Sequence, residues 1–147
     1  MEILSPVSGR AMPITDVPDP VFAGLMVGPG VGVDPVREAG TAVAPIAGTI
    51  VKLHPHAYVI SGDGKSVLVH LGIDTVQLKG EGFTLHASAG APVAAGVAIV
   101  SWDPAAVEAG GKSPAVRVVA LEGSAEALSG LVTTGDIAAG DVVFVWA

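Results

Sequence analysis

The stretch from His56 to His70 reads HAYVISGDGKSVLVH, and it identifies the chain as a β-protein. Two segments rich in β-branched and apolar residues flank a Gly-Asp-Gly run, a pattern typical of a β-hairpin. A three-residue hairpin loop commonly ends in a left-handed residue, a conformation that glycine adopts readily. We therefore expect antiparallel strands over residues 57–61 and 66–71, joined by a loop over residues 62–64.

The register of this hairpin controls whether its two histidines meet, and the length of the loop sets that register. With a three-residue loop, Ser61 pairs with Lys65. Counting outward then places His56 directly opposite His70. Facing residues in an antiparallel pair have Cβ atoms about 4.5–5.5 Å apart on one face of the sheet. A four-residue loop would put the two imidazoles on opposite faces unless a bulge restored the register. The three-residue loop that we favour predicts a two-histidine site able to share a phosphate or a metal ion.

The rest of the chain repeats short apolar runs between turn residues. Half of its 147 residues are hydrophobic but only 4% are aromatic, and 20 glycines and 11 prolines disfavour a helical bundle. Many runs are apolar on both faces, as in a closed barrel or a sandwich. We expect one domain over residues 1–147, an all-β, compact antiparallel sandwich or barrel. Its further strands are expected over residues 28–33, 41–44, 48–53, 83–87, 98–102, 115–121 and 142–146.

Two short helical turns interrupt this pattern. Asp103 is a suitable N-cap, Pro104 suits the first helical position, and Gly110 can end the helix. A second turn is expected over residues 124–128. A weak internal repeat also relates residues 92–100 to residues 136–144, since each reads as a glycine turn followed by an apolar strand, and this suggests two related halves.

Charge and composition exclude several classes of function. The net charge is −7, and the seven lysines and arginines are scattered, so there is no basic stripe for nucleic acid or an anionic membrane. The absence of cysteine excludes disulfides and a cysteine nucleophile, and it fits the cytosol. The sequence has no signal-peptide pattern and no uncharged run long enough to span a bilayer. We expect a cytoplasmic protein without direct membrane insertion.

Four segments resemble one protein family in the same order. Residues 69–83 read VHLGIDTVQLKGEGF and are similar to the active-histidine signature of the enzyme IIA component, glucose family, of the bacterial phosphoenolpyruvate-dependent sugar phosphotransferase system. Residues 5–9 (SPVSG), 17–23 (VPDPVFA) and 44–50 (APIAGTI) resemble its other motifs. The resemblance covers nearly the whole chain, and it implies a compact all-β fold and a free-standing phosphocarrier.

The resemblance also implies roles for individual residues. His70 matches the histidine that accepts a phosphoryl group from the phosphocarrier protein HPr, and His56 matches the second histidine, which helps to pass the group to a cysteine of a IIB domain. Phe22 matches an aromatic residue at the apolar rim where partners dock, while Asp19 and Asp74 match acidic residues beside the site. Regulatory target proteins of the family bind the same face, and no cofactor is required.

The residue types suit this chemistry. A neutral imidazole can attack phosphorus at physiological pH because its pKa lies near 6.5. We expect Nε2 of His70 to be the nucleophile, with Nδ1–H bonded to a backbone carbonyl in the turn over residues 71–73. His56 would donate a hydrogen bond to the phosphoryl oxygens. For Asp74 and Asp19, simple turn chemistry is an equally good interpretation.

Zinc binding is the chief alternative. His54 and His56 lie two residues apart, and with His70 they would make three ligands, a number typical of a catalytic zinc site. Family members often carry threonine where this chain has His54. A zinc peptidase of the lysostaphin type needs a further upstream histidine that the chain lacks. Zinc held by His56 and His70 in a regulatory complex remains open.

A biotinyl or lipoyl carrier domain is a second alternative, because residues 44–50 look like part of one. Such a domain needs a lysine on an exposed hairpin in a particular setting, and no lysine of this chain has it. A purely structural sandwich would leave the segment around His70 unexplained.

Overall fold

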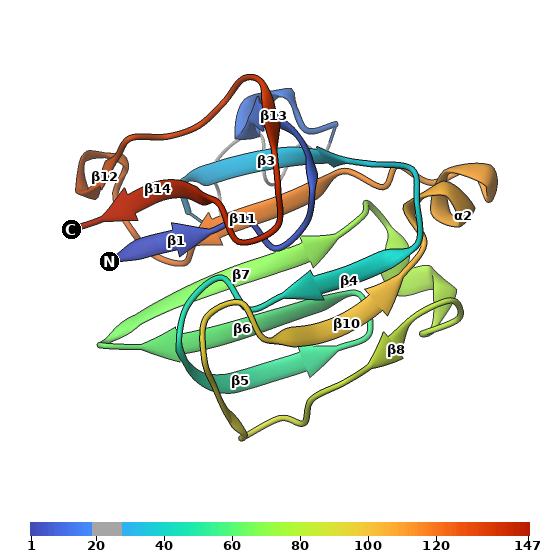
Figure 1. Ribbon diagram of the computed structural model, residues 1–147, viewed down its shortest axis with the longest axis horizontal. Coiled ribbons are helices and arrows are strands. Elements are labelled where there is room, and N and C mark those ends of the chain that lie inside the picture. The colour runs from blue at the N-terminus through green and yellow to red at the C-terminus, as the bar shows by residue number, and fades with distance from the viewer. Residues whose placement is uncertain (19–27) are drawn as a thin grey trace.

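The computed structural model describes residues 1–18 and 28–147, and it is built from antiparallel β-strands around one apolar interior (Figure 1). The all-β class expected from the sequence is confirmed. The strands are β1 (Glu2–Leu4), β2 (Gly9–Pro13), β3 (Gly30–Pro35), β4 (Gly40–Val43), β5 (Gly48–His54), β6 (Ala57–Gly62), β7 (Lys65–Leu71), β8 (Thr84–Leu85), β9 (Pro92–Val93), β10 (Ala98–Trp102), β11 (Val116–Ala120), β12 (Leu128–Ser129), β13 (Asp136–Ile137) and β14 (Val142–Trp146). The helical segments of the described chain are α2 (Pro104–Ala109) and the 3-10 helices η1 (Ile14–Asp16), η2 (Thr75–Leu78) and η3 (Ala125–Ala127).

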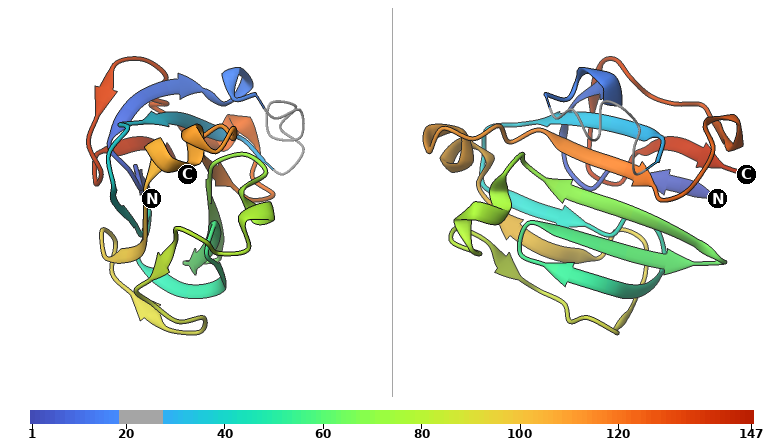
Figure 2. Two further views of the ribbon diagram at one scale, coloured as in Figure 1. Left: turned by 90° about the vertical axis from the view of Figure 1, so that its right-hand side faces the viewer. Right: turned by 180° about the vertical axis from the view of Figure 1, so that it is seen from behind.

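One long sheet carries most of the strands, and two small sheets complete the enclosure. The long sheet has the order β13-β2-β3-β11-β7-β6-β5-β9, and the small sheets have the orders β4-β10-β8 and β1-β14-β12. When the molecule is viewed along its long axis, β4 and β10 lie across the interior from β6 and β7 (Figure 2). The Tyr58 hydroxyl of β6 donates to the Val43 carbonyl of β4 at 2.7 Å. The strands therefore enclose a filled core rather than an open channel.

The hairpin between β6 and β7 has a two-residue loop, Asp63-Gly64, instead of the three-residue loop expected from the sequence. Both residues are left-handed, with φ values of 52° and 78°. A type I′ turn requires this conformation at both positions, and its twist matches that of the paired strands. Asp-Gly is therefore sufficient to close the hairpin, and Gly62 pairs with Lys65.

The shorter loop shifts the register by one residue, so the expected pairing of the histidines was wrong. Ser61 pairs with Ser66, and Ala57 rather than His56 lies directly opposite His70. His56 precedes β6 and stands outside the strand alternation. Its side chain is consequently placed by the preceding turn and not by the hairpin register.

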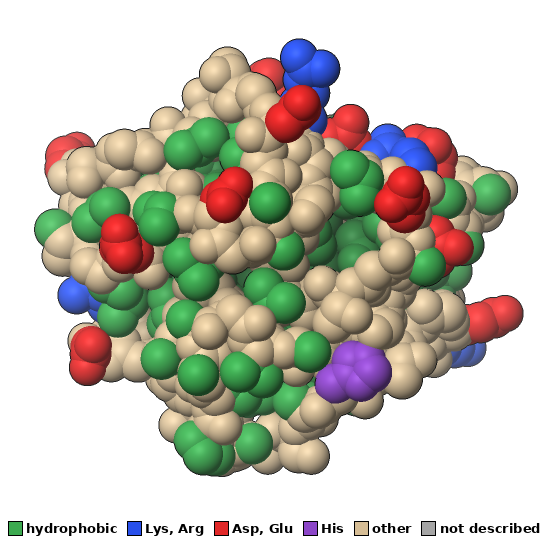
Figure 3. All heavy atoms as spheres, viewed as in Figure 1, with side chains coloured by type: hydrophobic (Ala, Val, Ile, Leu, Met, Phe, Trp, Pro, Cys, Tyr) green, Lys and Arg blue, Asp and Glu red, His purple; other side chains and the backbone are tan. Residues whose placement is uncertain are grey.

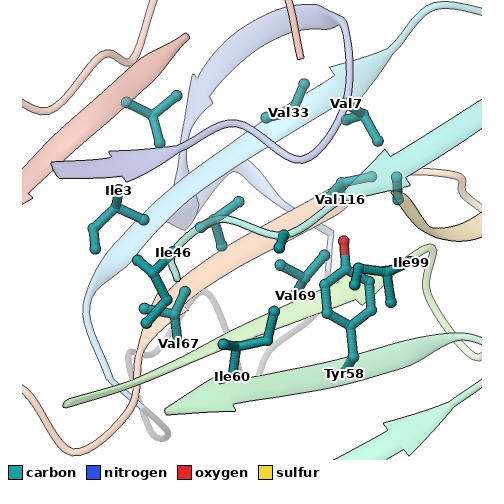
Figure 4. Packing of buried hydrophobic residues seen from close by; sticks show 14 of the residues in the cluster. Ile3, Val7, Val33, Ile46, Tyr58, Ile60, Val67, Val69, Ile99 and Val116 are labelled. Atoms are coloured by element: carbon teal, nitrogen blue, oxygen red, sulfur yellow. The ribbon is translucent and has the colours of Figure 1, made fainter. Parts of the chain in front are cut away.

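Alternation along β7 fixes the face on which His70 lies. Val67 and Val69 are fully buried, and they point into the same interior as Tyr58 and Ile60 of β6 (Figure 4). Successive side chains of a strand point to opposite faces, so His70 lies on the other side of the sheet. A slip of one residue would expose the valines, and the core therefore strongly specifies this register.

The weak repeat in the sequence corresponds to a repeat in the structure. β9 leads through a glycine turn into β10, and β13 leads through a glycine turn into β14. Gly96 donates its backbone N–H to the Ala44 carbonyl, and Gly140 donates to the Ser5 carbonyl, both at 2.9 Å. Each acceptor immediately precedes a proline, so the two halves share the same hydrogen bond between a turn glycine and a residue that precedes proline.

Helix α2 agrees with the sequence analysis in its cap and its end. The Asp103 side chain accepts hydrogen bonds from the backbone N–H groups of Ala105 and Ala106, and Gly110 is the C-cap. The second expected turn is the short 3-10 helix η3. Across residues 1–18 and 28–147, no helix is long and apolar enough to cross a membrane.

Strand boundaries depart from expectation mainly at the short edge strands. The strand expected over residues 83–87 is reduced to β8, and the strand expected over residues 28–33 begins at Gly30. The short strands β1, β2, β9, β12 and β13 were not expected. They have two to five residues each, and pairing with a longer neighbour defines them more than their own sequence does.

Gly30 tests how tightly the sheet is packed beside the site. A Cβ at Gly30 would lie 1.9 Å from the Val118 carbonyl oxygen of β11. We expect Gly30→Ala to lower the free energy of unfolding by about 3 kcal/mol, because the two strands must separate. Urea denaturation measures this change.

Gly110→Ala is the matched control. Its Cβ would meet only the Ala106 and Val107 carbonyl oxygens at 3.5 Å, which is ordinary van der Waals contact. We expect a change within about 0.5 kcal/mol. Equal losses in both variants would contradict the close approach of β3 and β11.

Candidate functional site

His70 is the penultimate residue of β7, and a backbone carbonyl orients its imidazole. The ring is half-buried, and Nδ1 lies 2.8 Å from the Gly72 carbonyl oxygen. A carbonyl only accepts, so this contact is a hydrogen bond in the tautomer that carries its proton on Nδ1 and its lone pair on Nε2. A contact of this kind was predicted from the sequence within residues 71–73, and it is confirmed.

The turn after His70 is held rigidly in place. Gly72 has a φ of 80°, and a Cβ there would lie 2.4 Å from Cγ2 of Thr75. The buried Thr75 hydroxyl donates to the Leu71 carbonyl at 2.6 Å, and the Ile73 N–H donates to the Ser113 carbonyl at 2.9 Å. Glycine is needed where the backbone is left-handed and crowded. The carbonyl that faces His70 is therefore fixed before any ligand arrives.

His56 meets His70 despite the shifted register. It lies in the turn between β5 and β6, and its carbonyl accepts a hydrogen bond from the Leu71 N–H at 2.7 Å. The ring centroids of His56 and His70 are 5.2 Å apart, with an angle of 68° between the rings. The expected two-histidine pair is thus present, although the reason given for it from the hairpin register was wrong.

His54 extends the pair outward. It is the last residue of β5, is exposed, and stacks on His56 with ring centroids 5.7 Å apart. In the part of the chain that the structure describes, no three His, Cys, Asp or Glu side chains are arranged to hold a metal ion. The three-ligand zinc site of His54, His56 and His70 therefore finds no support.

Arg117 is the site residue that the sequence analysis missed. It lies directly opposite His70 in the pairing of β11 with β7, and its side chain is 1% exposed. Its Nη2 contacts Nδ1 of His70. Arg117 is the sole charge in the apolar run over residues 115–121. Because a buried charge is costly without a specific interaction, this isolated arginine was the available signal.

Both imidazoles are held neutral. Burial, and then the Arg117 cation, lower the pKa of His70 to about 3, against the opposing effect of the Gly72 carbonyl. Burial also lowers the pKa of His56, with smaller contributions from His54 and Arg117. A neutral imidazole keeps a nitrogen lone pair available, so both rings are in the form that nucleophilic attack and hydrogen bonding require.

The predicted partner-binding residues are only partly placed. Asp74 is exposed in the turn after His70, has a φ of 59°, and its carbonyl accepts from the Gln77 N–H at 3.0 Å. Its backbone thus forms the turn before η2, in line with the turn interpretation. Asp19 and Phe22 lie outside the described residues.

The structure is thus a barrel-like β-domain that presents two adjacent neutral imidazoles. Comparison with known proteins then identifies the family. The family model of the phosphoenolpyruvate-dependent sugar phosphotransferase system, EIIA 1, matches residues 1–125. The chain belongs to this family, whose members have a phosphocarrier role in sugar uptake.

Individual relatives support the same assignment. The chain is 39% identical over 140 residues to the PTS system glucose-specific EIIA component of Bacillus cereus, covering 93% of this chain and 82% of that protein. It is also 39% identical over 141 residues to the PTS system glucose-specific EIICBA component of Streptococcus pneumoniae. That match covers 94% of this chain but only 19% of the longer relative. The structure resembles glucose permease IIA from Mycoplasma capricolum, with a TM-score of 0.88, 30% identity, and coverage of 98% and 94% of the two chains.

The low pKa of His70 can be measured by NMR titration of its ring protons. We expect a midpoint near pH 3, well below the ordinary value of about 6.5. Because the folded state keeps His70 neutral while the unfolded chain takes up a proton, stability is complete above about pH 6.5 and declines as the pH falls towards 3.

His70→Gln serves as the control for this pH dependence. Glutamine cannot titrate, so the variant should lose part of the decline in unfolding free energy between about pH 6.5 and 4. A titration midpoint near 6.5 in the wild type, or an unchanged stability profile in the variant, would contradict the neutral, buried state of His70.

Proposed function

We propose that Nε2 of His70 accepts a phosphoryl group from phosphorylated HPr and passes it to a cysteine of a IIB domain during sugar uptake. The observation that carries this proposal is the geometry of the His70 ring. Its Nδ1 lies 2.8 Å from the Gly72 carbonyl oxygen, and this orientation supports Nε2, the other ring nitrogen, as the attacking atom. A nucleophile for phosphoryl transfer must be fixed in line with phosphorus, and it needs little covalent help.

The transfer is a displacement at phosphorus. The Nε2 lone pair of His70 forms the new N–P bond while the N–P bond to the donor histidine of HPr breaks. The donor imidazole leaves with the bonding electron pair and takes up a proton, while Nδ1 of His70 releases its proton, so that the phosphorylated ring is neutral. His70 begins neutral because its pKa is low, so no prior deprotonation is required.

His56 is proposed to bind the phosphoryl oxygens. Its ring centroid is 5.2 Å from that of His70, which is close enough for an N–H to reach a group attached to Nε2. Hydrogen bonds to a developing anion strengthen as its charge grows. In the onward step, a cysteine thiolate of the IIB domain attacks phosphorus and the N–P bond breaks. Its electron pair returns to Nε2, and Nδ1 takes up a proton, so His70 becomes a neutral imidazole again.

Partner choice is supported by the relatives and by charge. The name of the Streptococcus pneumoniae relative joins A, B and C components in one chain, which supports a IIB domain as the acceptor for this one. The net charge of −7 favours a basic docking partner. On the face shown in Figure 3, some acidic side chains are scattered, while others lie beside Lys or Arg side chains at the top and upper right. We keep Asp19, Phe22 and Asp74 as proposed docking residues for HPr, the IIB domain and regulatory proteins.

The phosphocarrier role is tested by incubating the protein with purified phospho-HPr and measuring its intact mass. We expect one acid-labile phosphoryl group in the wild type and none in His70→Ala. His56→Ala should still accept the group, but we expect it to pass the group to a IIB domain about 100-fold more slowly.

His86→Ala is the matched histidine control, because His86 is exposed and bonds Ser101 on β10 at 2.6 Å. It should accept and donate at the wild-type rate. Absence of phosphoryl gain in the wild type, with the same phospho-HPr active on a known acceptor, would overturn the proposed function. Full phosphorylation of His70→Ala would place the group elsewhere.

We also propose that this transfer needs no metal ion. Phosphoryl transfer between two imidazoles requires only a positioned nucleophile and charge stabilisation, and the site supplies both through its own side chains. Treatment with EDTA, followed by transfer from purified phospho-HPr, should leave the rate within about twofold of the untreated protein. A loss of transfer that zinc restores would instead support a metal held by His56 and His70.

A further inference from the structure

We propose that Arg117 is a positioning residue that keeps Nδ1 of phosphorylated His70 unprotonated, and thereby preserves the phosphoryl group between its two transfers. This inference rests on the proposed function. It concerns the lifetime of the carried group, which depends on the ring nitrogen away from phosphorus. Arg117 lies against that nitrogen.

The sheet fixes Arg117 in place. Arg117 is the second residue of β11, lies directly opposite His70, and pairs on its other side with Gly32 of β3. Its neighbours Val116 and Val118 are fully buried on the interior face. The backbone of Arg117 is therefore paired with strands on both sides, and this pairing fixes the position of the guanidinium beside the imidazole.

Two neighbours of Nδ1 favour opposite protonation states. The Gly72 carbonyl oxygen, at 2.8 Å, can only accept a hydrogen bond, so it favours a proton on Nδ1. The guanidinium of Arg117 can only donate, so it favours an unprotonated Nδ1. The protonation of Nδ1 is thus the variable that this pair of contacts controls.

The unmodified protein holds both contacts at once, and phosphorylation changes which of them is the hydrogen bond at Nδ1. Before transfer, Nδ1–H donates to the Gly72 carbonyl, and the lone pair of Nε2 forms the N–P bond. The product ring would be cationic if Nδ1 kept its proton, so Nδ1 releases that proton to solvent while the departing donor imidazole takes one up. The neutral phosphorylated ring then accepts a hydrogen bond at Nδ1 from Arg117.

The protonation of Nδ1 matters because it sets how easily the N–P bond breaks. When water attacks phosphorus, the bonding electron pair returns to Nε2. A protonated ring leaves as neutral imidazole, whereas an unprotonated ring leaves as an imidazolate anion, which is a much poorer leaving group. Arg117 disfavours the protonated ring and so slows hydrolysis, while the Gly72 carbonyl remains available to receive the Nδ1–H during transfer to the acceptor.

The charged and titratable groups described around the His70 ring also favour an unprotonated Nδ1. Arg117 faces it from β11, His56 faces it from the turn before β6, and His54 stacks on His56. Arg117 is a cation, and both Arg117 and His56 lower the pKa of the unmodified His70 ring. A phosphoryl dianion adds negative charge beside the guanidinium, which stabilises the phosphorylated state further.

The experiment compares the wild type with R117M and R117K. Each protein is loaded with phospho-HPr, separated from the donor, and followed by intact mass between about pH 5 and 9. We expect wild-type hydrolysis to change little across this range. R117M should lose its phosphoryl group about tenfold faster for each unit by which the pKa of the phosphorylated ring rises. R117K keeps the charge without the planar fork and should fall between the two.

The outcomes separate this inference from the proposed function. Failure of the wild type to become phosphorylated on His70 would sink both, while a phosphorylated wild type whose decay profile matches that of R117M would sink this inference alone. If R117M does not fold, 15N NMR of the phosphorylated wild type tests the inference directly, because it reports whether Nδ1 of His70 is protonated. An unprotonated Nδ1 at pH 6 supports the proposal, and a protonated Nδ1 overturns it.

Discussion

The pairing of β7 between β6 and β11 is the constraint on which the rest of the site depends. It places three neighbouring backbones in fixed register, with Ala57 on one side of His70 and Arg117 on the other. Burial of Val67 and Val69 locks that register, because a shift of one residue would turn the apolar face outward. The imidazole therefore occupies one position on a rigid sheet rather than on a loop. Such support suits the proposed role of His70, in which one imidazole meets two different partners in the same geometry.

Burial gives the site its chemistry. The half-buried His70 ring has a pKa of about 3, mainly because the charged imidazolium is poorly solvated there, and the adjacent Arg117 cation acts in the same direction. The imidazole is then neutral at any physiological pH, as the proposed nucleophilic role requires. The Gly72 carbonyl offers a partner for Nδ1–H, so the neutral ring also has a preferred orientation. The fold thus supplies orientation and electrostatics, and the imidazole itself supplies the reactivity.

The sequence predicted the fold class, the hairpin and the family well, because these depend on repeated local patterns and on distinctive motifs. It did not predict the hairpin loop, since Gly-Asp-Gly accommodates both a two-residue and a three-residue turn, and one residue decides the facing pair. His56 and His70 nevertheless meet, because His56 lies in a turn outside the strand alternation. Arg117 was missed because its partner, His70, is 47 residues away in the sequence and comes close only through the pairing of β7 with β11. A lone charge in an apolar strand marks such a residue, but only the register identifies what it contacts.

The most direct test of the account is to determine which nitrogen carries the phosphoryl group. NMR of the 15N-labelled, phosphorylated protein can resolve phosphorus coupling to each ring nitrogen of each histidine. The account predicts a single phosphoryl group on Nε2 of His70, with His56 unmodified. A phosphoryl group on Nδ1 of His70, or on His56, would contradict the orientation that the Gly72 carbonyl and Arg117 give to the ring.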